Sequence, residues 1–170
     1  MIDERIVISD TNILFDLMAI ELLDSFFRMP WEVLTTDFVM DEIKQLEQKQ
    51  HINKFVASNK LKVIQNESIE LSEIFTLFRV NRNNASIADC SVWHLAKKRN
   101  ARLLTGDAKL RKSAEADSVK VSGVLFIFDC LVDYGIEDKK TCAVKLMDLM
   151  KINSRLPKSE CMKRIESWLK

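Results

Sequence analysis

The chain has 170 residues, of which 47% are hydrophobic and 30% are charged, and its formal net charge is +1. This length is typical of one domain with its own core. No apolar run approaches the roughly 20 residues that a membrane-spanning helix needs, so no membrane association is expected. The four cysteines have no CxxC motif and no paired spacing, and only two histidines are present. A histidine-rich zinc site is therefore nearly excluded, and a reducing cytoplasm is the expected setting.

Charge is unevenly distributed along the chain. Residues 1–47 contain eleven acidic and three basic residues, whereas residues 97–112 contain seven basic residues and one acid, Asp107. Such runs are often solvated faces. They would also suit an acidic metal pocket with a basic rim for a phosphate backbone. The charge pattern by itself leaves both interpretations open.

The first predicted element is a strand over residues 6–9, with the sequence IVIS, that leads into Asp10. The run is short, β-branched and not alternating, which is typical of a strand buried on both faces of a parallel sheet. In open parallel α/β sheets, ligands bind outside the carboxyl ends of the strands. Asp10 is therefore a candidate metal ligand at that edge.

Helix and strand patterns alternate after Asp10. Thr11 or Asn12, Thr36 or Asp37, and Ser68 are expected to cap helices. Helices are predicted over residues 13–27, 38–50 and 69–79, and strands over residues 32–35 and 61–64, with a helical turn and loop over residues 51–60.

Glu42 is a second candidate ligand, on the predicted helix over residues 38–50. Its neighbours at i−4, i−3 and i+4 are Phe38, Val39 and Leu46, so its carboxylate is directed toward the apolar side. A carboxylate there loses hydration unless it has a partner. It is either an acid at the edge of the apolar stripe that reaches water or a metal ligand directed toward Asp10.

Asp89 lies on the apolar face of a helix predicted over residues 85–96, among Ser86, Val92 and Trp93. A charge on that face needs a partner, a metal or a proton. The structural alternative is a carboxylate that caps the helix or forms a buried salt bridge.

Residues 102–107 repeat the pattern of the first strand, because the apolar run leads through Thr105 and Gly106 to Asp107. Gly106 permits a tight turn, and a helix is predicted to begin at Ala108. Asp107 can therefore be the N-cap of this helix, a metal ligand, or both.

The rest of the chain adds a strand over residues 119–121 and helices over residues 124–134, 138–152 and 158–169. Repeated strand–helix units predict a three-layer α/β/α fold with a central, mainly parallel sheet of four to five short strands. We expect a single domain over residues 1–170, with residues 136–170 as a C-terminal helical extension packed on it.

Four acids are expected to share one pocket, namely Asp10, Glu42, Asp89 and Asp107. Carboxylates side by side raise each other's pKa, so they need a cation in order to stay ionised. A ligand set of oxygen atoms without histidine or cysteine selects Mg²⁺ or Mn²⁺. Such an ion completes its shell with water and substrate phosphate, which is the chemistry of metal-assisted phosphodiester hydrolysis.

These motifs together resemble those of PIN domains. The matching segments are ISDTN at residues 8–12, Glu42, SIAD at residues 86–89 and LTGDAKLR at residues 104–111. VSGV at residues 121–124 and the helix that follows also resemble the last part of small PIN proteins. The likeness covers essentially residues 5–135.

The resemblance implies an α/β/α nuclease that cuts RNA with Mg²⁺ or Mn²⁺. It puts Asp10, Glu42, Asp89 and Asp107 at the four acidic positions of the family. Supporting polar positions fall on Thr11, Asn12, Ser86 and Thr105. Many small bacterial members are toxins of the VapC kind, often dimeric and held by a small antitoxin, so the implied partners are RNA, an antitoxin and a second copy. This chain is longer than a minimal toxin, mostly at its C-terminus.

The predicted activity is metal-dependent endoribonuclease cleavage. Asp10, Asp89 and Asp107 hold the metal directly or through water, and Glu42 is a further ligand or orients and deprotonates the attacking water. Basic side chains near the acids position the RNA backbone without reading its sequence, and the candidates are Lys109 and Arg111.

Two other classes stay open from the residues. One is a non-catalytic RNA-binding or regulatory PIN module, which would bind without turnover. The other is a phosphatase of the haloacid-dehalogenase type, which needs a second Asp two residues after the nucleophile, where this chain has Asn12. A Rossmann dinucleotide binder is not expected, because no GxGxxG motif follows the first strand.

Overall fold

A five-stranded parallel sheet forms the centre of the molecule, in a computed structural model that describes residues 5–170. The strands are β1 (Ile6–Ser9), β2 (Glu32–Thr36), β3 (Leu61–Ile64), β4 (Arg102–Leu104) and β5 (Val121–Ser122), in the order β3-β2-β1-β4-β5. The helices are α1 (Thr11–Ala19), α2 (Leu23–Phe26), α3 (Asp37–Asp41), α4 (Leu46–Ala57), α5 (Ser68–Asn81), α6 (Ile87–Arg99), α7 (Ala108–Ala116), α8 (Val124–Asp133), α9 (Lys139–Ile152) and α10 (Lys158–Leu169).

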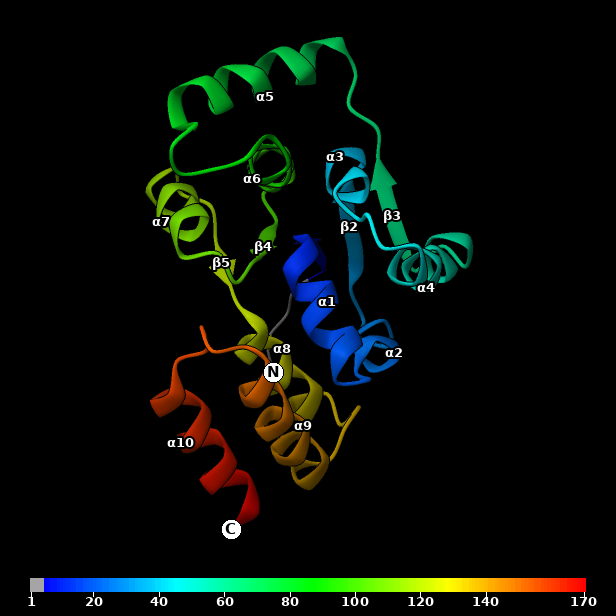
Figure 1. Ribbon diagram of the computed structural model, residues 1–170, viewed down its shortest axis with the longest axis vertical. Coiled ribbons are helices and arrows are strands. Elements are labelled where there is room, and N and C mark those ends of the chain that lie inside the picture. Colours follow the sequence, from blue (N-terminus) through cyan, green and yellow to red (C-terminus); the bar gives the residue numbers. More distant parts are fainter. Residues whose placement is uncertain (1–4) are drawn as a thin grey trace.

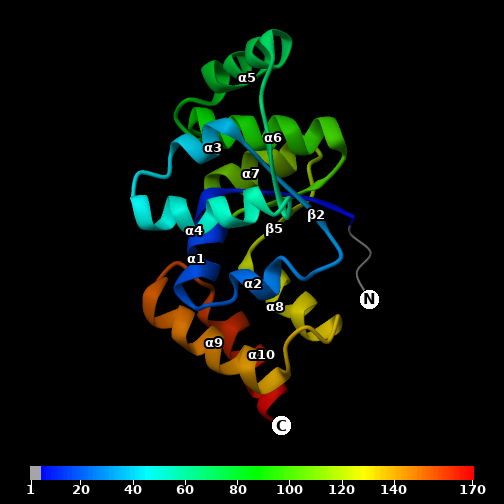
Figure 2. The same cartoon turned by 90° about the vertical axis from the view of Figure 1, so that its right-hand side faces the viewer.

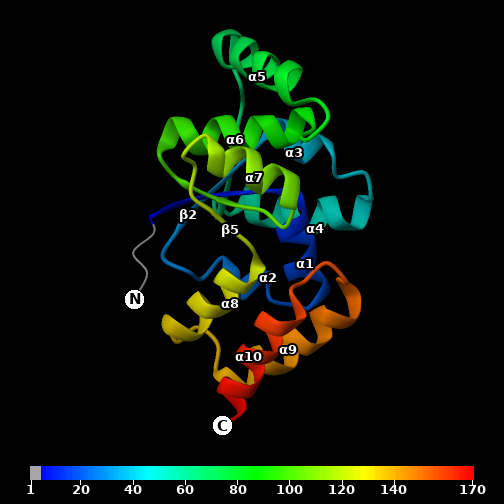
Figure 3. The same ribbon diagram turned by 90° about the vertical axis from the view of Figure 1, so that its left-hand side faces the viewer.

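Helices cover both faces of this sheet. Figures 1 and 2 show α1, α2, α8, α9 and α10 on one side and α6 and α7 on the other, with α5 lying outside α6. Figure 3 shows the opposite side of the molecule, where α10 lies along α9, far from α5. The predicted three-layer α/β/α fold with a parallel central sheet is therefore confirmed.

The two faces of β1 belong to different hydrophobic clusters. Ile8 is in register with Leu34 of β2 and Leu103 of β4, and all three pack toward α3, α6 and α7. Val7 is in register with Val33, and both pack toward α1, α8 and α9. Because both faces are buried, β1 carries apolar side chains without alternation, as parallel strands in this kind of fold do.

The C-terminal helices α9 and α10 pack into the same cluster as α1 and α8. Their fully or nearly fully buried side chains are Cys142, Ala143, Leu146, Leu149, Cys161 and Ile165. Arg164 of α10 also donates two hydrogen bonds to the carboxylate of Asp129 in α8, at 2.8 and 2.7 Å. We infer that residues 136–170 are an integral part of one folding unit.

The prediction of one continuous helix over residues 13–27 is wrong, because the structure has two helices there, α1 and α2. Glu21 has a positive φ of 59°, and the amide of Leu22 donates to the carbonyl of Leu17 at 2.9 Å. This left-handed turn ends α1 before α2 begins. Because neither glycine nor proline occurs between residues 19 and 23, the usual sequence signals of a helix end are missing.

The prediction for residues 38–60 is also wrong. The structure ends α3 at Asp41 and starts α4 at Leu46, and α4 runs through most of the segment that was expected to be a turn and loop. Glu42 therefore lies at the C-cap of α3 rather than inside a helix, and Leu46 is 70% exposed. Glu42 and Leu46 are therefore not in one helix, and the i+4 spacing used to predict the orientation of Glu42 does not apply.

Smaller differences concern the ends of elements. The N-cap of α5 is Glu67 rather than Ser68, and it makes no side-chain capping hydrogen bond. The last strand is shifted to Val121–Ser122, where it pairs with β4. Gly135, with φ +66°, follows α8 as expected. Within residues 5–170, no helix combines the length and apolar character needed to cross a membrane.

Replacing Leu146 of α9 tests whether the C-terminal helices belong to the main folding unit. Leu146 is fully buried, so Leu146→Ala should lower the free energy of unfolding by about 2–5 kcal/mol. Val144→Ala on the same helix is the matched control, because Val144 is 44% exposed, and it should change stability by less than about 0.5 kcal/mol. Urea unfolding followed by tryptophan fluorescence and by circular dichroism should give one coincident transition. Separate transitions for the two probes would show that α9 and α10 unfold independently.

Candidate active site

The candidate site lies where the order of strands reverses. Within the sheet, β2 is the neighbour of β1 along one edge, and β4 is its neighbour along the other edge. The carboxyl ends of β1 and β4 therefore flank a topological switch point, which is where ligands bind in open α/β sheets. Asp10 directly follows β1, and Asp107 comes shortly after β4.

Asp10 is a buried carboxylate, only 3% exposed, that serves as the N-cap of α1. Its Oδ1 accepts a hydrogen bond from the amide of Thr11 at 2.6 Å. Its Oδ2 accepts from the hydroxyl of Thr105 at 2.8 Å. The prediction that Thr11 or Asn12 caps this helix is therefore wrong, because the acid itself occupies the cap.

The pKa of Asp10 is raised from 3.8 to about 6. Burial is the largest cause, because it removes water from the charged form. Repulsion from the carboxylates of Asp89 and Glu42 raises the pKa further, whereas the hydrogen bonds from Thr105 and Thr11 lower it. Asp10 is therefore a carboxylate whose charge its surroundings stabilise poorly.

Glu42 approaches the site from the end of α3, after β2. Its Oε2 accepts a hydrogen bond from the hydroxyl of Thr11 at 3.3 Å. Burial raises the pKa of Glu42, and repulsion from Asp89 raises it as well. Glu42 is thus electrostatically coupled to the other acids, although the reason given for its orientation from the sequence was wrong.

Asp89 enters the site from the first turn of α6. It forms a capping box with Ser86, in which the amide of Ser86 donates to Asp89 Oδ2 at 2.8 Å and the amide of Asp89 donates to Ser86 Oγ at 3.1 Å. Burial raises the pKa of Asp89, and repulsion from Asp107 adds to that shift. The structural alternative, a capping Asp, is therefore realised, and the same carboxylate still raises the pKa of Asp10 and of Glu42.

Asp107 is the N-cap of α7, and its Oδ1 accepts from the amides of Lys109 at 2.8 Å and Leu110 at 2.9 Å. Its own amide donates to the hydroxyl of Thr105 at 3.1 Å. Thr105 is thus hydrogen-bonded to both acids at the switch point, which explains why this hydroxyl is fully buried.

The four acids form one electrostatically coupled group, but they are not drawn together into a ligand set. Among residues 5–170, no three acidic, histidine or cysteine side chains are close enough to hold a metal ion. The hydrogen bonds described above hold Asp10, Asp89 and Asp107 at the starts of their own helices, and they hold Glu42 at the hydroxyl of Thr11. The donor set still fits Mg²⁺ or Mn²⁺, because Mg²⁺ usually binds through one or two carboxylates and keeps several waters. In the described part of the chain, no Lys or Arg side chain forms an ion pair with any of the four.

The basic run over residues 97–112 does not form one continuous rim. Lys97 and Lys98 pair with Asp117 and Glu70 at the far end of α6. Lys109 is exposed in the first turn of α7, directly beside Asp107. Arg111 is half-buried, and Asn12 is exposed on the first turn of α1. Lys109 and Arg111 remain the basic candidates on α7, and Lys44 also acts on the acids, because its charge counteracts the rise in the pKa of Glu42 that burial causes.

A set of buried hydroxyls next to the acids was missed by the sequence interpretation. The hydroxyl of Thr35 donates to the carbonyl of Ser9 at 2.9 Å, which ties the end of β2 to the end of β1. The hydroxyls of Thr36 and Ser91 lie 2.6 Å apart, which ties β2 to α6. The two threonines at the end of β2 were the sequence signal for these hydrogen bonds. Their partners, Ser9 and Ser91, are distant in sequence and could not be identified from it.

Comparisons with known proteins identify the family and the fold. A family model described as a PIN domain matches residues 6–169. The solved structure of PAE2754 from Pyrobaculum aerophilum is similar over 79% of this chain and 100% of its own, at 14% identity and a TM-score of 0.53. VapBC2 from Rickettsia felis, bound to a DNA fragment from its promoter, matches over 69% of this chain and 98% of its own, at 16% identity and a TM-score of 0.48. FitAcB from Neisseria gonorrhoeae matches over 68% and 95%, at 14% identity and a TM-score of 0.42. No match to a curated protein is found.

Substitution of Asp10 by Asn should remove the pH dependence that this carboxylate gives to the stability of the metal-free protein. The folded-state pKa of about 6 lies above the ordinary value of 3.8, so ionised Asp10 destabilises the fold. The stability present below pH 3.8 is lost as the pH rises through 6. Asp10→Asn keeps the cap through its Oδ1 and does not titrate, although its Nδ2 cannot accept from Thr105, so its unfolding free energy relative to the wild type should rise by on the order of 2–3 kcal/mol from low to neutral pH. Urea unfolding between pH 4 and pH 8 measures this, and a difference independent of pH would contradict it.

Proposed function

The chain belongs to the PIN-domain family, whose members are generally nucleases, and on this premise we propose that it is a metal-dependent endoribonuclease. The observation that carries the proposal is the burial of Asp10 beside other carboxylates at the switch point of the sheet. A buried carboxylate with other carboxylates around it and no ion pair is unfavourable in the absence of a cation. Their position is therefore easier to explain by metal binding than by stability.

The proposed roles follow from burial and hydrogen bonding. Asp10, Asp89 and Asp107 hold Mg²⁺ or Mn²⁺ directly or through water, and Thr105 orients the first and last of these. Glu42 is the most exposed acid, which suits it to orient the attacking water or accept its proton. A bound divalent cation supplies charge stabilisation at the scissile phosphate and lowers the pKa of bound water.

The other supporting groups act around the acids. Thr11 holds Glu42 through its hydroxyl, and Ser86 holds Asp89 through the capping box. Asn12, exposed next to the cap of α1, is available to a substrate. Lys109 and Arg111 are proposed to contact the RNA backbone, because they lie on α7 just after Asp107.

Partners beyond RNA remain predictions from the family. A small antitoxin and a second copy of the chain are both expected for PIN toxins, and a cytoplasmic location goes with them. A non-catalytic RNA-binding module remains the second candidate, favoured by the observation that the carboxylates are hydrogen-bonded apart. The haloacid-dehalogenase alternative loses its support, because the chain belongs to the PIN family.

Cleavage of a labelled single-stranded RNA tests the proposal. The wild type should cleave it with Mg²⁺ or Mn²⁺ and not with chelator. Asp10→Asn and Asp89→Asn should each slow cleavage by roughly two orders of magnitude or more, the scale at which loss of a charge-stabilising group is measured. Asp133→Asn, at an exposed position on α8, is the matched control and should cleave like the wild type.

Two results would contradict this proposal. Cleavage that persists in chelator and survives both substitutions would exclude the metal mechanism and indicate a contaminating nuclease. RNA binding without turnover at saturating Mn²⁺ would favour the non-catalytic module. Binding is measured by fluorescence anisotropy with the same RNA, so the two outcomes are separated in one set of samples.

A further inference from the structure

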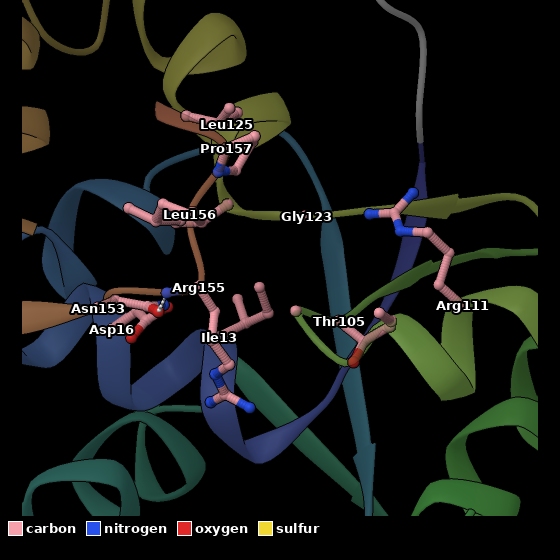
Figure 4. A pocket seen from close by; sticks show the side chains of 13 residues that line it. Ile13, Asp16, Thr105, Arg111, Gly123, Leu125, Asn153, Arg155, Leu156 and Pro157 are labelled. Carbon is pink, nitrogen blue, oxygen red and sulfur yellow. Dashed lines mark hydrogen bonds between the residues drawn. The ribbon is translucent and has the colours of Figure 1, made fainter. Parts of the chain in front are cut away.

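A cavity of about 320 Å³ lies beside the acids, on the side of the sheet that carries α1 and α8. Its wall includes Thr105, whose hydroxyl donates to Asp10, and Gly106, the residue before Asp107. Figure 4 shows the cavity between the start of α1, the turn after β4 and the segment over residues 153–157. The cavity and the acids therefore share one wall.

The lining combines apolar surfaces with two arginines. Apolar side chains come from three elements that are distant in sequence, namely Ile13, Val124, Leu125, Leu156 and Pro157. Arg111 and Arg155 line the same cavity from α7 and from the segment over residues 153–157 (Figure 4). The volume is at the lower end of the roughly 300–1,000 Å³ that small-molecule sites have. This chemistry suits a flat aromatic ring that carries an anionic group.

Arg111 is held against the cavity wall rather than free in solvent. Its Nη1 donates to the carbonyl of Val121 at 3.3 Å and to Glu115 Oε1 at 3.4 Å. A Cβ on Gly123 would lie only 3.3 Å from Arg111 Nη2, so the absence of a side chain there leaves room for the guanidinium. The guanidinium is therefore positioned before any ligand arrives.

The loop that carries Arg155 is fixed onto α1. Asn153 Nδ2 donates to Asp16 Oδ2 at 3.0 Å, and Asn153 Oδ1 accepts from the amide of Arg155 at 3.0 Å (Figure 4). The connection between α9 and α10 thereby completes a wall that residues 5–135 alone would leave open. The side chain of Arg155 is exposed and counteracts the rise in pKa that burial causes in Asp16, which also lines the cavity, so an anionic ligand would share this guanidinium with the carboxylate.

We propose that this cavity binds one nucleotide of single-stranded RNA, adjacent to the phosphate that the four acids engage. The base lies between the apolar side chains, and the phosphates on either side of the nucleotide lie at Arg111 and at Arg155, which line the cavity from opposite sides. Proteins hold unpaired bases against aromatic, apolar or arginine surfaces, of which this cavity offers the last two, and arginine is well suited to phosphate. The position of this nucleotide beside the scissile phosphate rests on the proposed nuclease function, whereas nucleotide binding itself does not.

Titration with nucleoside 5′-monophosphates tests this site in chelator, without any need for activity. The four monophosphates and ribose 5-phosphate are added to the full chain, and binding is followed by calorimetry and by amide NMR shifts. At least one nucleotide should bind about tenfold more tightly than ribose 5-phosphate. Shifts should concentrate at Gly106, Gly123 and Arg155, and they should be absent at Phe75 on α5.

Variants of Arg155 show whether the charge is responsible. Arg155→Ala should weaken nucleotide binding about tenfold, the scale of one charge-assisted hydrogen bond, and Arg155→Lys should restore part of it. Lys158→Ala is the matched control, because Lys158 is an exposed cation in the next helix that does not line the cavity. In RNA cleavage, Arg155→Ala should raise KM about tenfold and leave kcat nearly unchanged.

The outcomes separate this inference from the proposed function. Equal binding of ribose 5-phosphate and of every nucleotide would overturn the base subsite, and wild-type binding by Arg155→Ala would overturn the assigned location. Either result alongside Mg²⁺-dependent cleavage would leave the nuclease standing. Nucleotide binding at this cavity without cleavage would support the subsite and count against the nuclease.

Discussion

The hydrogen bond from Thr105 to Asp10 connects the ends of β1 and β4 at the point where the sheet reverses its order. It is the contact on which the site depends, because it holds a buried carboxylate where two strands separate. The donors to Asp10 are neutral, so they satisfy its oxygens without cancelling its charge. Nearby Glu42 and Asp89 then raise its pKa rather than lower it. The fold thus maintains a concentration of negative charge that it does not itself neutralise.

Three of the four acids are also helix caps. Asp10 caps α1, Asp107 caps α7, and Asp89 closes a capping box at the start of α6. The starts of α1 and α7 lie at the carboxyl edge of the sheet, because β1 and β4 lead into them, whereas α6 follows α5. The local requirement for a cap and the proposed requirement for metal ligands therefore select the same residue type at the same place. A carboxylate has lone pairs enough for both, so one use does not exclude the other.

The C-terminal helices contribute to the core and to the surroundings of the site. Leu146 and Leu149 extend the cluster beneath α1 and α8, while Asn153 holds the following loop against Asp16. This arrangement brings Arg155 to the side of the cavity opposite α7. Residues 136–170 thus pack into the core and also supply part of the cavity surface next to the acids.

The sequence alone determined the sheet and the family, and it singled out the four acids as candidates for the site. Short apolar runs that end in Asp10 or Asp107 predict a buried strand followed by a capped helix. They can do so because strand burial and helix capping depend on neighbouring residues. The break after α1 and the early end of α3 were not predicted, because Glu21 adopts a left-handed conformation without glycine and no proline marks either boundary. The orientation of Glu42, the link from Thr36 to Ser91 and the cavity were decided only by the tertiary structure. Each of them joins side chains that are distant along the chain, and no local pattern encodes which distant residue will be the partner.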